Sequence, residues 1–239
     1  MPALTRFILL YAAMYAAFGV ASPFLPAFLT ARGLAPEHLG FVLGAGTAVR
    51  LLTSPLAGRI GDLLQALRVV LVACIALAAA VTLGYLGAHG FLLLLCVSLL
   101  QAAALAPITI LADALALGSA APPRGSGRRG FEYGWVRGTG SAAFIGGTLV
   151  SGHAVSTFGL DIIVVFQASL LGAATFAAIL VPELVHDRRF PAVRAPARGV
   201  LLLLHERDAA RRRRQRLDAA DRALERHAGR FEVALEQDR

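Results

Sequence analysis

The sequence predicts an all-α polytopic membrane protein in which six helices cross the bilayer and a basic C-terminal tail follows them. Of its 239 residues, 57% are hydrophobic and 16% are charged, whereas soluble domains carry about 45–50% apolar and about 25% charged residues. The charges are also unevenly distributed, because residues 183–239 hold 24 of the 38 Arg, Asp and Glu residues. This composition excludes a soluble globular domain, a disordered chain and a disulfide scaffold.

Six apolar stretches are long enough to cross a bilayer, since about 20 helical residues span the ~30 Å hydrocarbon core. Short connections rich in Gly and Pro separate them. Pro23 and Pro26 in the first stretch and Pro107 in the fourth are predicted to kink or break their helices. The predicted spans are residues 7–29, 39–56, 69–88, 91–117, 136–155 and 162–181.

The arginines of the loops alternate between the two sides of the predicted bundle. Arg59 and Arg68 lie between spans two and three, three arginines lie between spans four and five, and Arg188 and Arg189 follow span six. Arg32 is alone on the opposite side. Because basic loops stay in the cytoplasm, we expect a multi-pass protein of the inner (plasma) membrane with both termini cytoplasmic.

Three charged residues fall within or at the edge of the predicted spans, namely Arg50, Asp113 and Arg137. A charge at the bilayer centre costs about 2.5–3.5 kcal/mol on insertion scales, so such residues are candidate functional groups. Two interpretations of Arg50 remain open. Its side chain can extend to the membrane interface, or it can face the bundle and meet Asp113 or an anionic substrate.

Small residues that permit close helix packing recur in spans two and five. Their spacing supports a helical bundle. They are Gly40, Gly44, Gly134, Gly138, Gly140, Gly146 and Gly147.

The sequence gives no indication of an enzyme. Ser141 and His153 are the residue types of a serine hydrolase, but they are twelve residues apart on one predicted helix, which separates them by about 18 Å. There is no cluster of residues with metal-ligand spacing. We therefore expect no catalytic residues, no metal and no cofactor.

Four motifs together resemble the N-terminal half of a major facilitator superfamily transporter, in the branch that holds lactose permease and the phenylpropionate permeases. They occupy residues 22–29, 55–62, 111–117 and 132–144, and the last is the most specific. The resemblance covers roughly residues 5–185. It implies that the six helices are half of a twelve-helix bundle.

The resemblance assigns roles to particular residues. Gly58, Gly61 and Asp62 match the superfamily motif between spans two and three, whose Asp helps to hold the two halves together. Asp113 matches an acid of span four, and Arg137 matches the span-five Arg that pairs with it and binds substrate.

The resemblance also bears on the transported solute. Phe144 falls where lactose permease has a Trp that stacks on sugar. This substitution favours an aromatic acid or another small organic solute over a sugar. We expect Asp113, Arg137, Arg50 and Phe144 to line the substrate pathway of a proton-linked permease.

Transporters of this superfamily have two six-span halves, with the substrate site between them near the midplane. Six spans are predicted here, so three alternatives stay open. In the first, the chain is the N-terminal half of a transporter. In the second, it is a truncated and inactive fragment, and in the third, it is a half-sized protein that works as a homodimer.

After the sixth span the composition changes. We divide the chain into a transmembrane unit of residues 1–185, a cytoplasmic linker of residues 186–204 and an Arg/Ala-rich tail of residues 205–239. The tail is compatible with a helix on the anionic leaflet, with an out-of-frame ending, or with nucleic-acid binding. The last is not expected, because acidic residues interleave with the arginines and aromatic residues are scarce.

Overall fold

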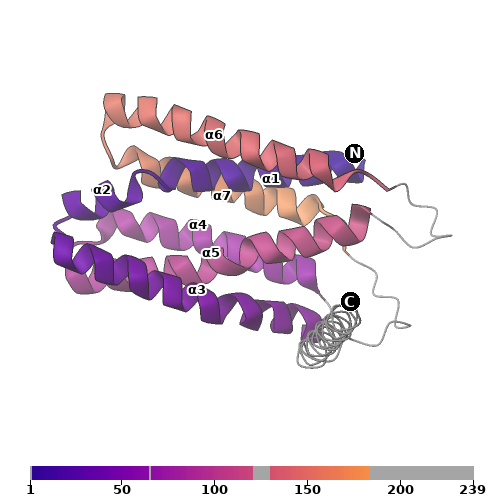
Figure 1. Cartoon of the computed structure of the whole chain (residues 1–239), viewed down its shortest axis with the longest axis horizontal. Helices are drawn as coiled ribbons and strands as arrows, with labels where there is room; N and C mark the ends of the chain where they lie inside the picture. Colours follow the sequence, from indigo (N-terminus) through magenta and orange to yellow (C-terminus); the bar gives the residue numbers. More distant parts are fainter. Residues whose placement is uncertain (1, 65, 121–129, 184–239) are drawn as a thin grey trace, which may run out of the picture. The chain divides into compact units, whose positions relative to one another are not determined.

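The apolar stretches of the sequence form α-helices. The computed structural model describes residues 2–64, 66–120 and 130–183, and these contain seven helices. The predicted linker of residues 186–204 and tail of residues 205–239 therefore lie outside the described residues. The helices are α1 (Ala3–Ala21), α2 (Leu25–Ala31), α3 (Pro36–Leu64), α4 (Leu67–Gly87), α5 (Phe91–Ala120), α6 (Tyr133–Phe158) and α7 (Ile162–Leu180) (Figure 1).

The first predicted span is interrupted at its prolines. α1 ends at Ala21, and α2 begins at Leu25 with Pro26 in its first turn, where a proline ring fits a helix without loss of a hydrogen bond. Pro23, which lies between them, has no N–H to continue the first helix. In contrast, α5 continues through Pro107, so the alternative that this proline breaks its helix is wrong.

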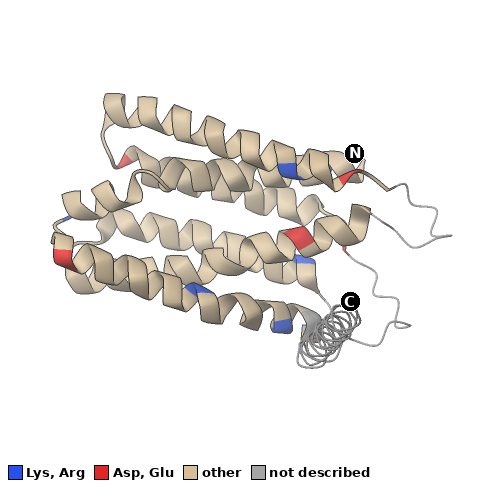
Figure 2. Ribbon diagram, viewed as in Figure 1, with Lys and Arg blue, Asp and Glu red and all other residues tan. Residues whose placement is uncertain are grey.

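Five helices are long and apolar enough to cross a membrane, namely α1, α3, α4, α5 and α7. Large apolar side chains such as Leu51, Leu149 and Phe176 are about 70% exposed, which suits contact with lipid rather than with water. Figure 2 shows that most of the length of each helix is free of charged residues. The chain is therefore a polytopic membrane protein.

α6 is long enough to span but is not among these five, and its sequence contains six glycines as well as Arg137 and His153. It corresponds to the fifth predicted span. Two of these glycines, Gly140 and Gly147, pack closely against α1.

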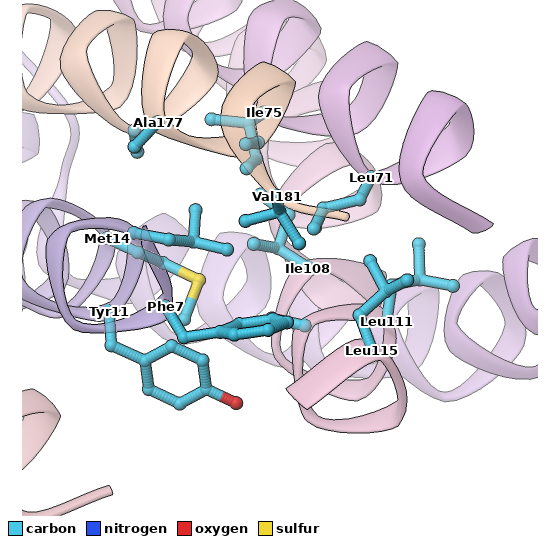
Figure 3. Close-up of a cluster of buried hydrophobic side chains, with 14 of the residues drawn as sticks. Phe7, Tyr11, Met14, Leu71, Ile75, Ile108, Leu111, Leu115, Ala177 and Val181 are labelled. Atoms are coloured by element: carbon cyan, nitrogen blue, oxygen red, sulfur yellow. The ribbon is translucent and has the colours of Figure 1, made fainter. Parts of the chain in front are cut away.

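The helices pack in a defined order of neighbours. α1 contacts α6 and α7 extensively, α4 contacts α5 and α7, and α3 packs against α5. One apolar core joins α1, α4, α5 and α7 (Figure 3). Its fully buried members include Phe7, Met14, Leu71, Ile108 and Leu115.

Glycines allow α1 and α6 to approach unusually closely. A Cβ atom on Gly147 would lie 2.5 Å from the backbone oxygen of Ala16, and one on Gly19 would overlap the backbone of Phe144. At the same interface the Thr148 hydroxyl donates a hydrogen bond to the Gly19 carbonyl at 3.0 Å. A Cβ atom on Gly140 would lie 2.9 Å from the Tyr15 ring, so Gly140 and Gly147 both perform the packing role that their spacing predicted.

The other five predicted packing glycines face open space, because a Cβ atom added to any of them would have no neighbouring atom within 4 Å. They are Gly40, Gly44, Gly134, Gly138 and Gly146. Spacing alone does not reveal which face of a helix meets a neighbour.

Arg32 and Arg68 form ion pairs and hydrogen bonds between the ends of neighbouring helices. The Arg32 side chain pairs with Asp161 at 2.8 Å and donates to the Leu86 carbonyl at 2.8 Å, which links the C-terminal ends of α2 and α4 to the start of α7. Arg68 pairs with Glu183 at 3.2 Å, and its guanidinium donates to the Val181 carbonyl just after α7. A cation at a helix C-terminus also interacts favourably with the helix dipole.

We predict that Gly147→Ala destabilises the bundle by about 1–3 kcal/mol, because the added methyl group has to displace the α1 backbone. Gly146→Ala is the matched control, since its Cβ position is open and alanine favours the helix by up to about 1 kcal/mol. The check is thermal unfolding of the purified protein in detergent. Equal shifts for the two variants would contradict the close approach of α1 and α6.

Candidate functional site

Asp113 of α5 forms a cluster with hydroxyl groups of two other helices, α1 and α6, and accepts hydrogen bonds from them. Its Oδ1 atom accepts hydrogen bonds from the hydroxyls of Tyr11 on α1 and Tyr133 on α6, the latter at 2.8 Å. Tyr11 is fully buried at the edge of the apolar core (Figure 3). Both hydroxyls donate to the same carboxylate oxygen, and hydrogen bonds to a charged acceptor are stronger than those between neutral groups.

Arg137 extends this cluster on the α6 side. Its Nη1 atom lies 3.9 Å from Asp113 Oδ1 and also donates to the Tyr15 hydroxyl. The guanidinium carbon is 5.2 Å from the centre of the Tyr15 ring, which is within the range of a cation–π contact. The structure thus brings the predicted pair Asp113 and Arg137 together, with Tyr11, Tyr15 and Tyr133 around it.

A separate cavity of about 800 Å³ lies among the helices. Its walls come from α1, α2, α3 and α5, with single contributions from α4, α6 and α7. Pockets for small organic ligands have volumes of about 300–1,000 Å³ and are mostly apolar with a few polar groups. The cavity is thus large enough for a small organic molecule.

Arg50 and Phe144 both line this cavity. Among the described residues of its wall, Arg50 alone carries a charge. The possible pairing of Arg50 with Asp113 does not occur, because Asp113 is engaged by the tyrosines and Arg137. The sequence indicates how deep Arg50 lies along α3 and Asp113 along α5, but not how each helix is rotated about its axis. In the structure the rotation of α3 directs Arg50 to the cavity.

Two hydrogen-bonded pairs of buried polar groups contribute to the cavity wall and were not among the predicted site residues. Gln101 of α5 donates to the Thr82 hydroxyl of α4 at 2.7 Å, and the Tyr85 hydroxyl donates to Ser98 at 3.1 Å. Gln101, Ser98 and Tyr85 line the cavity directly. The signal that points to them is a polar residue in the middle of a long apolar run, which is rare in membrane helices.

The motif residues Gly58, Gly61 and Asp62 lie in the last two turns of α3. Gly61 is buried, and a Cβ atom there would lie 2.6 Å from the Leu67 side chain. The side chain of Asp62 lies outside the described part of the structure, so its predicted role stays a prediction.

Comparison with known proteins decides the family. A model of the MFS_1-like family matches residues 4–215 of the chain. The chain belongs to the MFS_1-like family. This confirms the resemblance that the four motifs carry. The family consists of transporters and not of enzymes.

A search of characterised proteins finds the "Probable 3-phenylpropionic acid transporter" of Escherichia coli strain K12. It is 34% identical over 178 residues, which are 72% of this chain and 43% of the relative. The matched segment of this chain therefore corresponds to less than half of the length of that relative.

Within the described residues, no group of three or more His, Cys, Asp or Glu side chains is placed to hold a metal ion.

We predict that Tyr11→Phe destabilises the protein by about 1.5–3 kcal/mol, because it removes a hydrogen bond to a charged acceptor. Tyr85→Phe is the matched control, since Tyr85 is equally buried and its hydroxyl bonds to the neutral Ser98. The expected effect of that change is about 0.5–1.5 kcal/mol. Thermal unfolding in detergent measures both, and a larger effect at Tyr85 would contradict a charged Asp113 in the cluster.

Proposed function

We propose that this chain forms a six-span unit of a proton-linked permease for a small organic acid, with an aromatic acid as the preferred class. In this proposal α6 also crosses the membrane, as the fifth of six spans, and the protein lies in the inner membrane with both termini in the cytoplasm. The relative that matches the chain is described as a 3-phenylpropionic acid transporter, which supports an aryl carboxylate as the solute.

The observation that carries the proposal is the position of Arg50 in the cavity wall. Its guanidinium has no carboxylate partner among the described residues, and the described wall contains no acid. An unpaired cation within a span is unfavourable, so a bound anion would compensate it. Apolar wall residues such as Phe18, Leu105 and Phe144 would surround the remainder of the solute.

Asp113 and Arg137 are proposed as the polar pair of the transport pathway outside this cavity. They do not belong to the cavity wall, and they join α1, α5 and α6 through the tyrosine cluster. A pair that connects three helices suits a step in which helices move relative to one another. In this assignment Arg50 contacts the solute, and the pair supports its passage.

Alternating access requires two units that rock against each other. The matched relative is more than twice as long as the segment it shares with this chain. We therefore propose that transport involves a second six-helix unit, which a second copy of this chain could supply. The alternative is an inactive unit that binds the solute without transporting it.

We predict that Arg50→Gln weakens binding of 3-phenylpropionate to the purified chain at least tenfold, because hydrogen bonds to a charged group contribute about 1.5–3 kcal/mol. Arg59→Gln on the same helix is the matched control, since Arg59 does not line the cavity. Isothermal titration calorimetry in lipid nanodiscs measures both affinities. Unchanged binding by the Arg50 variant would refute the anion site.

We also predict that Arg137→Leu abolishes uptake of radiolabelled 3-phenylpropionate into vesicles, whereas binding of the acid in the cavity remains within about threefold of the unmodified chain. Arg59→Leu serves as the control for loss of an exposed arginine. Normal uptake by the Arg137 variant would contradict the role of the pair. Binding without uptake by the unmodified chain would favour the inactive alternative.

A further inference from the structure

The amide of Gln101 is held in one orientation by its neighbour on α4. Gln101 is 4% exposed, and its Nε2 atom donates to Thr82 Oγ1 at 2.7 Å. The Thr82 hydroxyl in turn donates to the Ala78 carbonyl at 2.7 Å, so its oxygen serves Gln101 as an acceptor. This arrangement directs the amide nitrogen to Thr82 and leaves the amide oxygen for another partner.

The amide oxygen has no such partner. Gln101 Oε1 is the one buried side-chain polar atom without a hydrogen bond among the residues that the structure describes. A buried acceptor without a donor is unfavourable, and in native proteins such a group calls for an explanation. The nearby hydroxyl of Tyr85 does not supply the donor, because it bonds to Ser98.

Gln101 and Arg50 line the same cavity from two different helices. We propose that the ligand of this cavity is an organic anion that also carries a neutral hydrogen-bond donor, such as a ring hydroxyl group, and that Gln101 Oε1 accepts this donor. This inference rests on the proposed function, in which Arg50 holds the carboxylate. The donor is neutral because the described wall contains no acid to hold an ammonium group.

Such a site discriminates between related acids. A ligand that lacks the donor leaves the buried acceptor unpaired, and sites built to hydrogen-bond a substrate hydroxyl reject analogues that lack it. Gln101 is then the specificity-determining residue. Thr82 is a positioning residue, because it acts only through the orientation of the amide.

The test measures binding of four matched acids, which fall into three classes, to the full chain in lipid nanodiscs by isothermal titration calorimetry. In 3-(4-hydroxyphenyl)propionate the ring hydroxyl is a hydrogen-bond donor, and in 3-phenylpropionate the ring carries no polar group. In 3-(4-methoxyphenyl)propionate the ether oxygen can only accept a hydrogen bond. The 3-hydroxyphenyl isomer is included to allow for the position of the donor. We expect the better hydroxylated acid to bind about tenfold more tightly than the other two classes, a difference of about 1.4 kcal/mol.

Three variants assign the preference to the amide. Gln101→Met keeps the size of the side chain but removes the acceptor, so the affinity ratio of hydroxylated to plain acid should fall to about one. Thr82→Val should reduce the ratio, because the amide loses its orientation, whereas Thr82→Ser keeps the hydroxyl and should preserve it. If the Gln101 variant does not fold, the ratio in the unmodified chain still tests the inference.

The outcomes separate this inference from the proposed function. If none of the acids binds, the proposed anion site fails and this inference fails with it. If the plain and hydroxylated acids bind equally, or the methoxy acid binds best, the donor preference is overturned while the anion site stands. A ratio that Gln101→Met leaves unchanged would overturn the assignment to Gln101.

Discussion

The close approach of α1 and α6 is the constraint on which the arrangement of polar groups depends. Because Gly19 and Gly147 carry no side chain at the contact, the two backbones meet directly, and the Thr148 hydroxyl bonds across the interface. This contact sets α6 against α1 so that Arg137 reaches Tyr15. It also explains two of the six glycines of α6, Gly140 and Gly147, which lie against α1. Packing of small residues replaces the hydrophobic effect as the force that joins helices in lipid.

The structure separates its intramembrane charges into two environments. Asp113 is surrounded by donors, with two tyrosine hydroxyls and Arg137 directed toward one carboxylate oxygen. Arg50 instead lies in the wall of a cavity whose described residues include no second charge. In the first arrangement the charge of Asp113 has partners within the protein, and in the proposed function a bound anion compensates the charge of Arg50 in the second. This difference is the physical basis for assigning solute contact to Arg50 and helix coupling to the pair.

Apolar length and proline chemistry were sufficient to predict the helices and the interruption near Pro23. The juxtaposition of Asp113 with Arg137 followed from a resemblance of motifs rather than from spacing. The rotation of each helix could not be predicted, because weakly amphipathic helices give little indication of which face is buried. For that reason the sequence did not identify Gly147 among seven similar glycines, and it did not separate Arg50 from the pair. The same reason left Gln101 unnoticed, although a glutamine within an apolar run is a detectable signal.

The central claim is that α6 crosses the membrane beside α1 and completes a six-span unit. The most direct test places single cysteines at Glu132 and Ser156, near the two ends of α6, after replacement of Cys74 and Cys96 by alanine. A membrane-impermeant maleimide is then applied to whole cells. We predict that the cysteine at residue 156 is labelled from outside and that the one at residue 132 is labelled only after permeabilisation. Labelling of both positions from the same side would contradict the claim.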